Sequence, residues 1–264
     1  MEIKGKVIVV TGAANGIGAA LAKRFSMLNA KAVVICDIDE KGVESLAQNI
    51  GKTFNNIRFM KCDVANRLDL EVVVSSTIKE FGQIDLFCSN AGIIVSGDQS
   101  TPTSEWQRAW DVNVMAHVNA ANAVLPDMLE RGEGYLLNTC SAAGMLTSVG
   151  AAPYAVTKHG ALAFAEWLSI TYGLQGIKVS ALCPQVVRTK MIEDAIETGA
   201  GSAVTSGGVM LESEDVAMQV VEALAKEQFL ILTHEETQKF AERKVADIDK
   251  WILGMQKYAA NQAT

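Results

Sequence analysis

Short apolar runs alternate along the chain with longer stretches in which apolar residues recur every three or four positions. The first run, KVIVVTG, precedes the helical period of GIGAALAKRFSML. The later runs are AVVICD, IRFMKCD, IDLFCSN, GYLLNTCS, IKVSALCP and FLIL. Runs that are apolar at nearly every position predict strands buried on both faces, and their alternation with helices predicts an α/β fold with a parallel sheet.

Nothing in this pattern divides the chain into parts. Residues 1–264 contain no linker and no repeat of solenoid period, and this length suits one large domain. The one shift in composition is the stretch 197–209, which is rich in Gly, Ser, Ala and Thr. It is equally consistent with a surface loop and with a mobile lid over a site, at about 190–212. A helical tail is expected at about 235–260.

Composition excludes several classes of protein. The net charge is −7 and the sequence pI is near 5.1, which argues against a nucleic-acid partner. No apolar run approaches the roughly 20 residues of a membrane span, and no signal-peptide pattern precedes the first strand, so a soluble cytoplasmic protein is expected. The five cysteines form no CxxC pair and each lies near the end of an apolar run. They predict small buried hydrophobes rather than a metal site or a disulfide framework.

The turn after the first strand carries the first candidate chemistry. TGAANGIG, residues 11–18, places Gly12, Gly16 and Gly18 between a strand and a helix, with Asn15 and Ile17 among them. Glycines at such a turn let the backbone approach a pyrophosphate, and the helix N-terminus favours its negative charge. The spacing differs from the GxGxxG dinucleotide motif, but the physical reasons are the same.

Asp37 ends the second strand, 19 residues after Gly18. A carboxylate at this place can accept both hydroxyls of an adenosine ribose and would repel a 2′-phosphate. Neither Asn15 nor Ile38 supplies a compensating cation, so NAD is expected rather than NADP. The alternative is that Asp37 is an ordinary turn residue.

Two further strand ends carry polar groups. CDV, residues 62–64, brings in Asp63 and Val64, and SNAG, residues 89–92, brings in Asn90, Ala91 and Gly92. Ligands of open α/β sheets bind outside the carboxyl ends of the strands, where both segments fall. A helix cap at Asp63 and a plain turn at 90–92 are the alternatives.

The chemistry is expected beyond the fifth strand. Ser141 follows that strand, Tyr154 comes 13 residues later, and Lys158 four residues after Tyr154. Residues i and i+4 share one helix face. An ammonium about 4 Å from the phenol would contribute roughly 4 kcal/mol, or up to about three pKa units, towards making Tyr154 a usable acid and base. A packing tyrosine with a coincidental lysine is the alternative.

Together with TGAANGIG, CDV, SNAG and Asn113 in WDVNVMAH, these residues resemble the short-chain dehydrogenase/reductase family in its compact single-domain form. The resemblance runs from about Lys6 to Thr189. It implies a Rossmann-like doubly wound three-layer sandwich with a mostly parallel seven-stranded sheet. It also implies a catalytic tetrad of Asn113, Ser141, Tyr154 and Lys158, in which Asn113 holds a water that links Lys158 to solvent.

The same resemblance extends to the other site residues. Its cofactor-binding positions are Gly12, Asn15, Gly16, Ile17, Gly18, Asp37, Asp63, Val64, Asn90, Ala91, Gly92, Tyr154, Lys158, Pro184, Val187 and Thr189. Gln185 stands where the family usually has Gly, and its amide either enters the substrate space or points to solvent. The expected substrate pocket comprises Ser141, Ala143, Met145, Tyr154, Gln185 and Met191, with no metal. Further apolar candidates are Ile93, Ile94, Val95, Ala142 and Ile192, each of which could equally be a core residue.

These features predict an NAD-dependent oxidoreductase that interconverts a secondary alcohol and a ketone on a mainly apolar, cyclic or aromatic substrate. The alternative is an NAD-binding sensor or scaffold without turnover. GALAFAEWLSI is apolar nearly all round, so that helix should bury more than one face, and a homotetramer is expected, with a dimer as the alternative. The tail segment DIDKWILGMQKYAANQ would lie on the substrate side or at a subunit contact.

Overall fold

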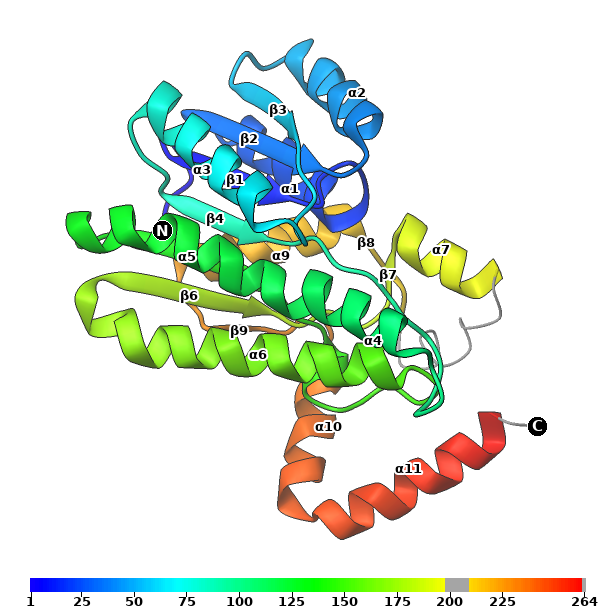
Figure 1. Ribbon diagram of the computed structural model, residues 1–264. Coiled ribbons are helices and arrows are strands. Elements are labelled where there is room, and N and C mark those ends of the chain that lie inside the picture. Colours follow the sequence, from blue (N-terminus) through cyan, green and yellow to red (C-terminus); the bar gives the residue numbers. More distant parts are fainter. Residues whose placement is uncertain (198–208, 263–264) are drawn as a thin grey trace.

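A single parallel sheet organises the molecule (Figure 1). The computed structural model describes residues 1–197 and 209–262. Seven strands pair in the order β3-β2-β1-β4-β5-β6-β9, and every pairing is parallel. The strands are β1 (Val7–Thr11), β2 (Ala32–Asp37), β3 (Ile57–Lys61), β4 (Leu86–Ser89), β5 (Gly134–Thr139), β6 (Ile177–Leu182) and β9 (Leu230–Ile231). The predicted seven-stranded α/β sandwich is therefore confirmed.

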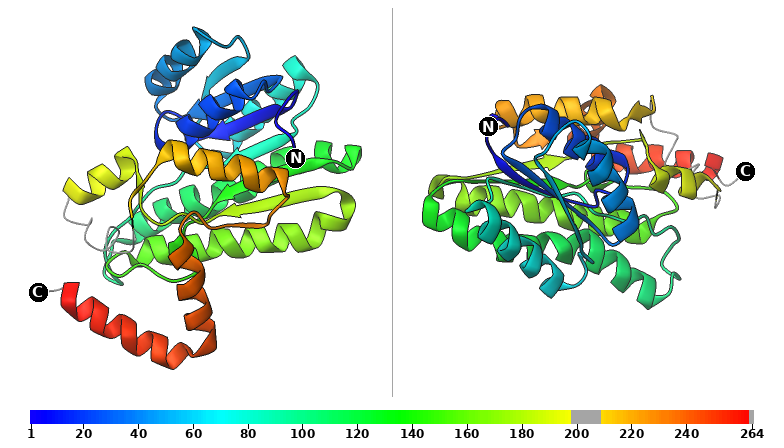
Figure 2. Two further views of the ribbon diagram at one scale, coloured as in Figure 1. Left: turned by 180° about the vertical axis from the view of Figure 1, so that it is seen from behind. Right: turned by 90° about the horizontal axis from the view of Figure 1, so that it is seen from above.

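Helices cover both faces of the sheet, as strands that are apolar at consecutive positions require (Figure 2). One face packs against α1 (Gly16–Met27), α2 (Glu40–Gly51) and α9 (Ser213–Ala225). The other packs against α3 (Arg67–Phe81), α5 (Ala116–Arg131) and α6 (Ala152–Tyr172).

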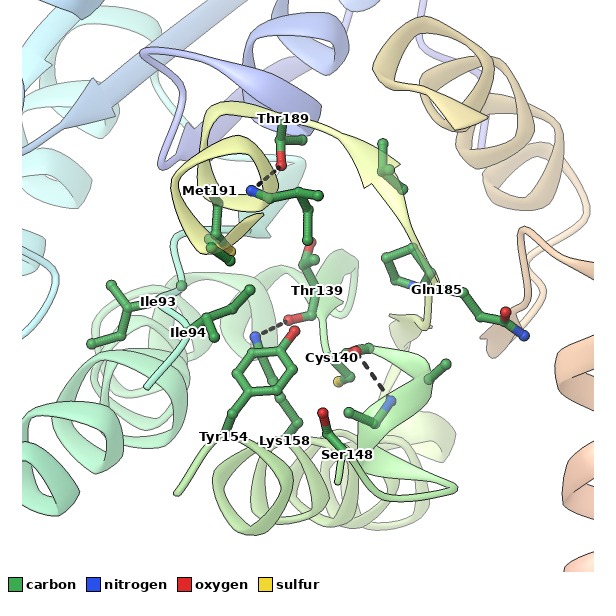
Figure 3. A pocket seen from close by; sticks show the side chains of 18 of the residues that line it. Ile93, Ile94, Thr139, Cys140, Ser148, Tyr154, Lys158, Gln185, Thr189 and Met191 are labelled. Atoms are coloured by element: carbon green, nitrogen blue, oxygen red, sulfur yellow. Dashed lines mark hydrogen bonds between the residues drawn. The ribbon is translucent and has the colours of Figure 1, made fainter. Parts of the chain in front are cut away.

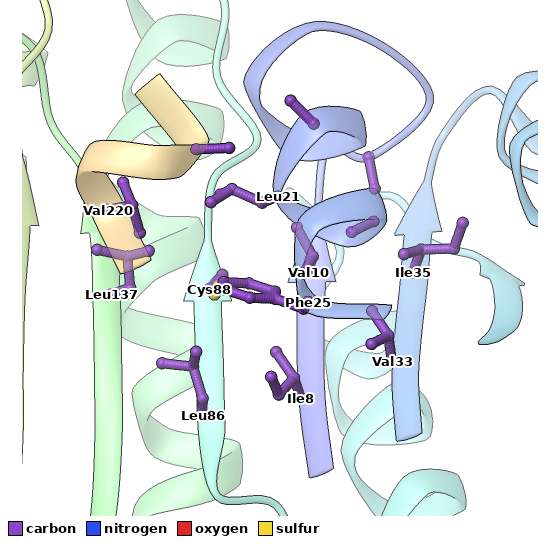
Figure 4. Packing of buried hydrophobic residues seen from close by; sticks show 14 of the residues in the cluster. Ile8, Val10, Leu21, Phe25, Val33, Ile35, Leu86, Cys88, Leu137 and Val220 are labelled. Atoms are coloured by element: carbon purple, nitrogen blue, oxygen red, sulfur yellow. The ribbon is translucent and has the colours of Figure 1, made fainter. Parts of the chain in front are cut away.

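Alternate residues of each strand enter the two cores. On β1, Ile8 and Val10 pack towards α1, while Val9 faces the α3, α5 and α6 layer. Figure 4 shows Phe25 of α1 seated over β1 and β4, among Ile8, Leu86 and Cys88. The inner strands β1, β4 and β5 thus bury both of their faces, whereas the edge strand β3 is partly exposed, with Phe59 40% exposed.

The long helical segment expected after the fourth strand is not one regular helix. It consists of α4 (Thr103–Trp110), a π-helical turn (Asp111–Met115) and α5. Hydrophobic periodicity cannot distinguish a π turn inside a helix, because the apolar face continues across it. The turn contains Asn113, and such insertions are frequent at functional sites.

The chain after β6 departs from the strand–helix alternation. A small parallel pair, β7 (Val187–Arg188) and β8 (Leu211–Glu212), flanks α7 (Lys190–Glu197). The expected lid at about 190–212 falls partly on α7, and its residues 198–208 lie outside the described residues. The helical tail consists of α10 (Glu235–Ala246) and α11 (Ile248–Gln262), which project from the body of the molecule (Figure 1).

All five cysteines are buried and free, as the sequence predicts. No described helix is long and apolar enough to cross a membrane. No group of His, Cys, Asp and Glu side chains among the described residues could hold a metal ion.

Candidate active site

One large cavity opens at the carboxyl ends of the strands. Its volume is about 1540 Å³, which exceeds the 300–1,000 Å³ range of ordinary ligand sites and leaves room for a dinucleotide beside a second molecule. It lies where the strand order reverses between β1 and β4, the place where ligands of doubly wound sheets bind. Most of the residues predicted for the two binding sites line this cavity.

The glycine loop closes tightly over the end of β1. Gly12 has φ +63°, and a Cβ there would lie 2.6 Å from the Cα of Ala91. A Cβ on Gly18 would lie 2.3 Å from the Gly12 carbonyl oxygen, so α1 can approach the loop only with glycine at this position. Gly12, Asn15, Gly16 and Ile17 line the cavity, whereas Gly18 supports the loop without lining it. The loop therefore leaves the N-terminus of α1 open to a ligand.

Asp37 lines the same end of the cavity and is half-buried. One carboxylate oxygen accepts the Ala14 amide at 2.9 Å and the other accepts the Asp39 amide at 3.0 Å. Each oxygen keeps a second lone pair, so the carboxylate can still accept ribose hydroxyls. Lys61 lies opposite Asp37 in the sheet, but its ammonium is 3.8 Å from the Glu40 carboxylate.

Asn90 joins three strand ends. Its amide nitrogen donates to the carbonyls of Thr11 and Gly12, and its amide oxygen accepts from Thr139 at 3.1 Å. The polar atoms of this side chain are thus hydrogen-bonded within the protein. The residue still lines the cavity, together with Asp63, Val64, Ala91 and Gly92. Asp63 does not cap a helix, since Asn66 caps α3.

Tyr154 and Lys158 rise from the N-terminal half of α6 into the cavity (Figure 3). The Lys158 ammonium is buried, donates to the Thr139 carbonyl at 3.1 Å, and lies 5.8 Å from the centre of the Tyr154 ring. Burial lowers the pKa of Lys158. Burial raises the pKa of Tyr154, and a hydrogen bond with the Ser141 hydroxyl lowers it. Burial is therefore the largest influence on the pKa of this phenol, which is raised rather than lowered as the four-residue spacing suggested.

Ser141 sits in a strained backbone conformation, with φ +128°. Positive φ in a non-glycine residue costs energy and occurs mainly where the surrounding structure imposes it. The residue follows β5 and caps the short helix Ala142–Gly144, whose Ala143 amide donates to the Ser141 hydroxyl at 3.1 Å. This arrangement holds the hydroxyl beside Tyr154 at the cavity wall.

Asn113 lies behind the cavity and does not line it. Its side-chain oxygen accepts the Ile93 amide at 2.9 Å, and its nitrogen donates to the Ile93 carbonyl and to the Thr157 hydroxyl. These bonds tie the loop after β4 to α6. The side chain is fully buried, and a Cβ on Gly92 would lie 3.3 Å from its oxygen and 3.1 Å from the Lys158 ammonium.

The other end of the cavity is mainly apolar. Ile93, Ile94, Ala142, Ala143, Met191 and Ile192 line it, together with Pro184, Val187 and Thr189 after β6. Val95 is buried and is not among the lining residues. Met145, expected in the pocket, lines a separate small pocket with Ala241, Lys244 and Val245 of α10.

Gln185 is among the residues that line the cavity. Its side chain points away from Tyr154 in Figure 3 and donates to the Thr237 hydroxyl of α10 at 2.7 Å. Its backbone amide donates to the His234 ring at 3.4 Å. Gln185 therefore anchors α10 to the end of β6.

The C-terminal helices supply lining residues that pattern reasoning left undecided. Those of α10 are Phe240, Arg243 and Ala246, and those of α11 include Lys250, Trp251, Met255 and Tyr258. The tail thus lies on the substrate side of the cavity. The amphipathic sequence of this segment shows that it has a face to bury, but it does not say against what.

Comparison with known proteins agrees with this geometry. The family model for short chain dehydrogenase matches residues 6–199. The chain is 32% identical to 1-deoxy-11-beta-hydroxypentalenate dehydrogenase of Streptomyces exfoliatus, covering 89% of this chain and 86% of that protein. It is 31% identical to a mitochondrial borneol dehydrogenase of Lavandula x intermedia, covering 82% of each chain. A short chain dehydrogenase/reductase from Burkholderia phymatum, solved in complex with NAD, superposes with a TM-score of 0.87 at 26% identity, covering 94% of this chain and 96% of that one.

The chain therefore belongs to the short-chain dehydrogenase/reductase family. Members of this family are oxidoreductases that use a nicotinamide cofactor.

Proposed function

We propose that the protein is an NAD-dependent oxidoreductase that interconverts a secondary alcohol and a ketone. The observation that carries this proposal is the convergence of Ser141, Tyr154 and Lys158 on the cavity that also contains the glycine loop. A proton-transferring phenol and a pyrophosphate cradle within one cavity suit hydride transfer better than binding alone.

The residues present fit a dinucleotide. A Cβ on Gly12 or Gly18 would collide with backbone, so the loop is shaped for close approach to the N-terminus of α1. Asp37 is placed to accept ribose hydroxyls, and its negative charge favours NAD over NADP. The bound nicotinamide would supply the hydride exchange.

Side chains of the protein transfer the proton of the substrate hydroxyl. Tyr154 Oη takes the proton of an alcohol or gives one to a ketone, while the Ser141 hydroxyl donates to the substrate oxygen and holds it beside the phenol. The buried Lys158 ammonium stabilises the phenolate that forms. Because burial raises the pKa of Tyr154, alcohol oxidation should become faster as the pH rises and the phenol loses its proton.

The substrate is expected to be mainly apolar and cyclic or aromatic. Ile93, Ile94 and Met191 line one side of the cavity, and Trp251 and Met255 of α11 line another. Burial of a rigid apolar ring against these side chains is favourable, whereas a strongly charged molecule would lose its hydration without gaining a charged partner among them. The names of two relatives, a hydroxypentalenate dehydrogenase and a borneol dehydrogenase, are consistent with an alcohol substrate.

The test is turnover by purified protein with NAD and a panel of apolar secondary alcohols. The Tyr154→Phe variant should lose at least about 100-fold in kcat while NAD binding is retained, because only the proton-transferring group has been removed. Tyr172→Phe is the matched control: Tyr172 is the last residue of α6, stacks edge-on against Trp167 and does not line the cavity. Full activity of Tyr154→Phe would refute the mechanism, and NAD binding without turnover of any alcohol would favour a sensor.

A further inference from the structure

A buried polar cluster extends from Lys158, which lines the cavity, to two side chains that do not line it. It consists of His117 on α5, Asn138 on β5 and Lys158 on α6, all three at most 4% exposed. His117 lies four residues after Asn113, on the layer of helices that faces β5. Both the Lys158 charge and Asn138 act on its ring.

Three atoms of this cluster are without protein partners. Neither His117 ring nitrogen nor the Asn138 amide nitrogen meets a hydrogen-bond partner among the residues that the structure describes. Asn138 is close enough to influence the imidazole, but the pair does not reach hydrogen-bond geometry. Buried polar atoms in native proteins almost always find a partner in protein or in ordered water, so these three require an explanation.

The charge state of His117 limits what it can do there. Burial, together with the Lys158 charge, lowers the pKa of His117 to about 3, so the ring is neutral at pH 7. A neutral imidazole has one N–H donor and one nitrogen acceptor. It can therefore accept a hydrogen from an ammonium or from a water bound to it, and pass one on through its other nitrogen.

Lys158 needs such an acceptor. The Thr139 carbonyl accepts one of its three ammonium hydrogens, and burial works against its charge. We propose that His117 is a positioning residue for Lys158: with Asn138 it holds buried water against the ammonium, which stabilises the charged form and extends the proton path inward from the catalytic cavity. This inference rests on the proposed function, because its purpose is to keep Lys158 charged beside Tyr154.

Kinetics with three variants test the proposal. His117→Leu is of similar size and has no polar atoms, His117→Gln keeps a donor and an acceptor, and His159→Leu changes the neighbouring exposed histidine of α6. His117→Leu should lower kcat by about tenfold or more, with the NAD dissociation constant unchanged, and His117→Gln should recover most of the loss. His159→Leu should behave as the parent protein.

The pH profile separates positioning from simple packing. The titratable groups that face Lys158 are His117, Tyr154 on its own helix, Cys140 after β5 and Cys183 after β6. In His117→Leu the acidic limb of kcat/KM for alcohol oxidation should move to higher pH, because a weakened ammonium favours the phenolate less. The pH dependence of kcat/KM measured for Cys183→Ala shows whether ionisation of the Cys183 thiol contributes to either limb of the profile. The melting temperature of His117→Leu is measured in parallel, so that a loss of activity caused by unfolding is recognised.

A measurement that needs no turnover distinguishes failure of the proposed role of His117 from failure of the proposed oxidoreductase function. In ¹⁵N spectra at pH 7, His117 should show a neutral ring, and Lys158→Met should shift its accepting nitrogen while His159 stays unchanged. Identical His117 shifts in both proteins, or a His117→Leu variant with parent kcat and pH profile, would overturn the inference. Failure of every alcohol as substrate would instead count against the proposed function, and the ¹⁵N comparison would still decide whether His117 contacts Lys158.

Discussion

Asp37 has both carboxylate oxygens in hydrogen bonds to backbone amides, at the end of β2 where the cavity begins. The same residue that orders the turn can therefore present a negative charge to a ribose. His117 shows a different constraint, because it is a titratable group with no polar partner among the described residues. Both residues lead to predictions that a single substitution can test.

Replacing Asp37 by Arg should change cofactor preference. The guanidinium would attract a 2′-phosphate and no longer accept ribose hydroxyls, so the ratio of kcat/KM for NADP to that for NAD should rise by more than about tenfold. The control is Glu44→Arg, the same change of charge on the exposed face of α2. An unchanged ratio in Asp37→Arg would remove Asp37 from the cofactor site.

His117 should make the fold sensitive to acid. Its pKa is about 3 in the folded protein and 6.5 as its ordinary value, so the unfolded chain takes up a proton that the folded chain does not. This contribution to stability is complete above pH 6.5 and is lost as the pH falls towards 3, at up to about 1.4 kcal/mol per pH unit. The free energy of unfolding, measured by urea denaturation at a series of pH values, should fall less steeply between pH 6.5 and 3 in His117→Leu than in the parent protein. Equal slopes would contradict the prediction.

At the scale of elements, the two C-terminal helices complete the cavity. α10 is attached to the end of β6 by Gln185 and Thr237, and α11 then brings Trp251 and Met255 into the lining. Lys244 of α10 also donates to the carbonyls of Met145 and Leu146, beside the short helix that follows Ser141. The tail therefore connects the substrate side of the cavity to the catalytic segment.

The bond between Gln185 and Thr237 should matter for substrate affinity more than for cofactor binding. Gln185→Ala removes one attachment of α10, so KM for the alcohol should rise by about tenfold while the NAD dissociation constant changes little. Gln238→Ala is the control, because its side chain donates to the exposed Glu242 on α10 itself. Steady-state kinetics and NAD titration measure both quantities, and an equal loss of NAD affinity would contradict this role.

At the scale of the whole molecule, the outer side of α4 and α6 presents apolar side chains. Trp110, Val156, Trp167 and Ile170 are between 40% and 82% exposed. Large apolar residues gathered on neighbouring helices mark an interaction surface more often than a solvated one. We propose that a second copy of the chain covers it, as in the homotetramer expected from the sequence.

Charge placed on this surface should dissociate the assembly. In the double variant Trp167→Glu, Ile170→Lys we expect the mass measured by light scattering to fall from that of a tetramer to that of a smaller species, because charge is disfavoured at an interface core. Val72→Glu on α3 is the control, since Val72 is 53% exposed and lies away from α6. A parent protein that is monomeric would rule out the tetramer directly.

The sequence by itself determined the sheet, the family and most of the residues that line the cavity. Short apolar runs that alternate with helical periods predict the strands of a parallel sheet, whose carboxyl ends place Gly12, Asp37, Asn90 and Ser141 along one edge. These inferences succeed because they depend on order along the chain and on local backbone geometry.

Tertiary structure alone decided how the side chains share their contacts. The four-residue spacing predicted that Tyr154 and Lys158 share one helix face. It could not show that the ammonium donates to the Thr139 carbonyl, or that burial is the largest influence on the pKa of Tyr154. Nor could spacing predict that Gln185 bonds to α10, that Met145 lies in a separate pocket, or that His117 of α5 lies near Lys158. Each of these depends on which distant segments pack together, and hydrophobic periodicity shows only that a face is buried, not what buries it.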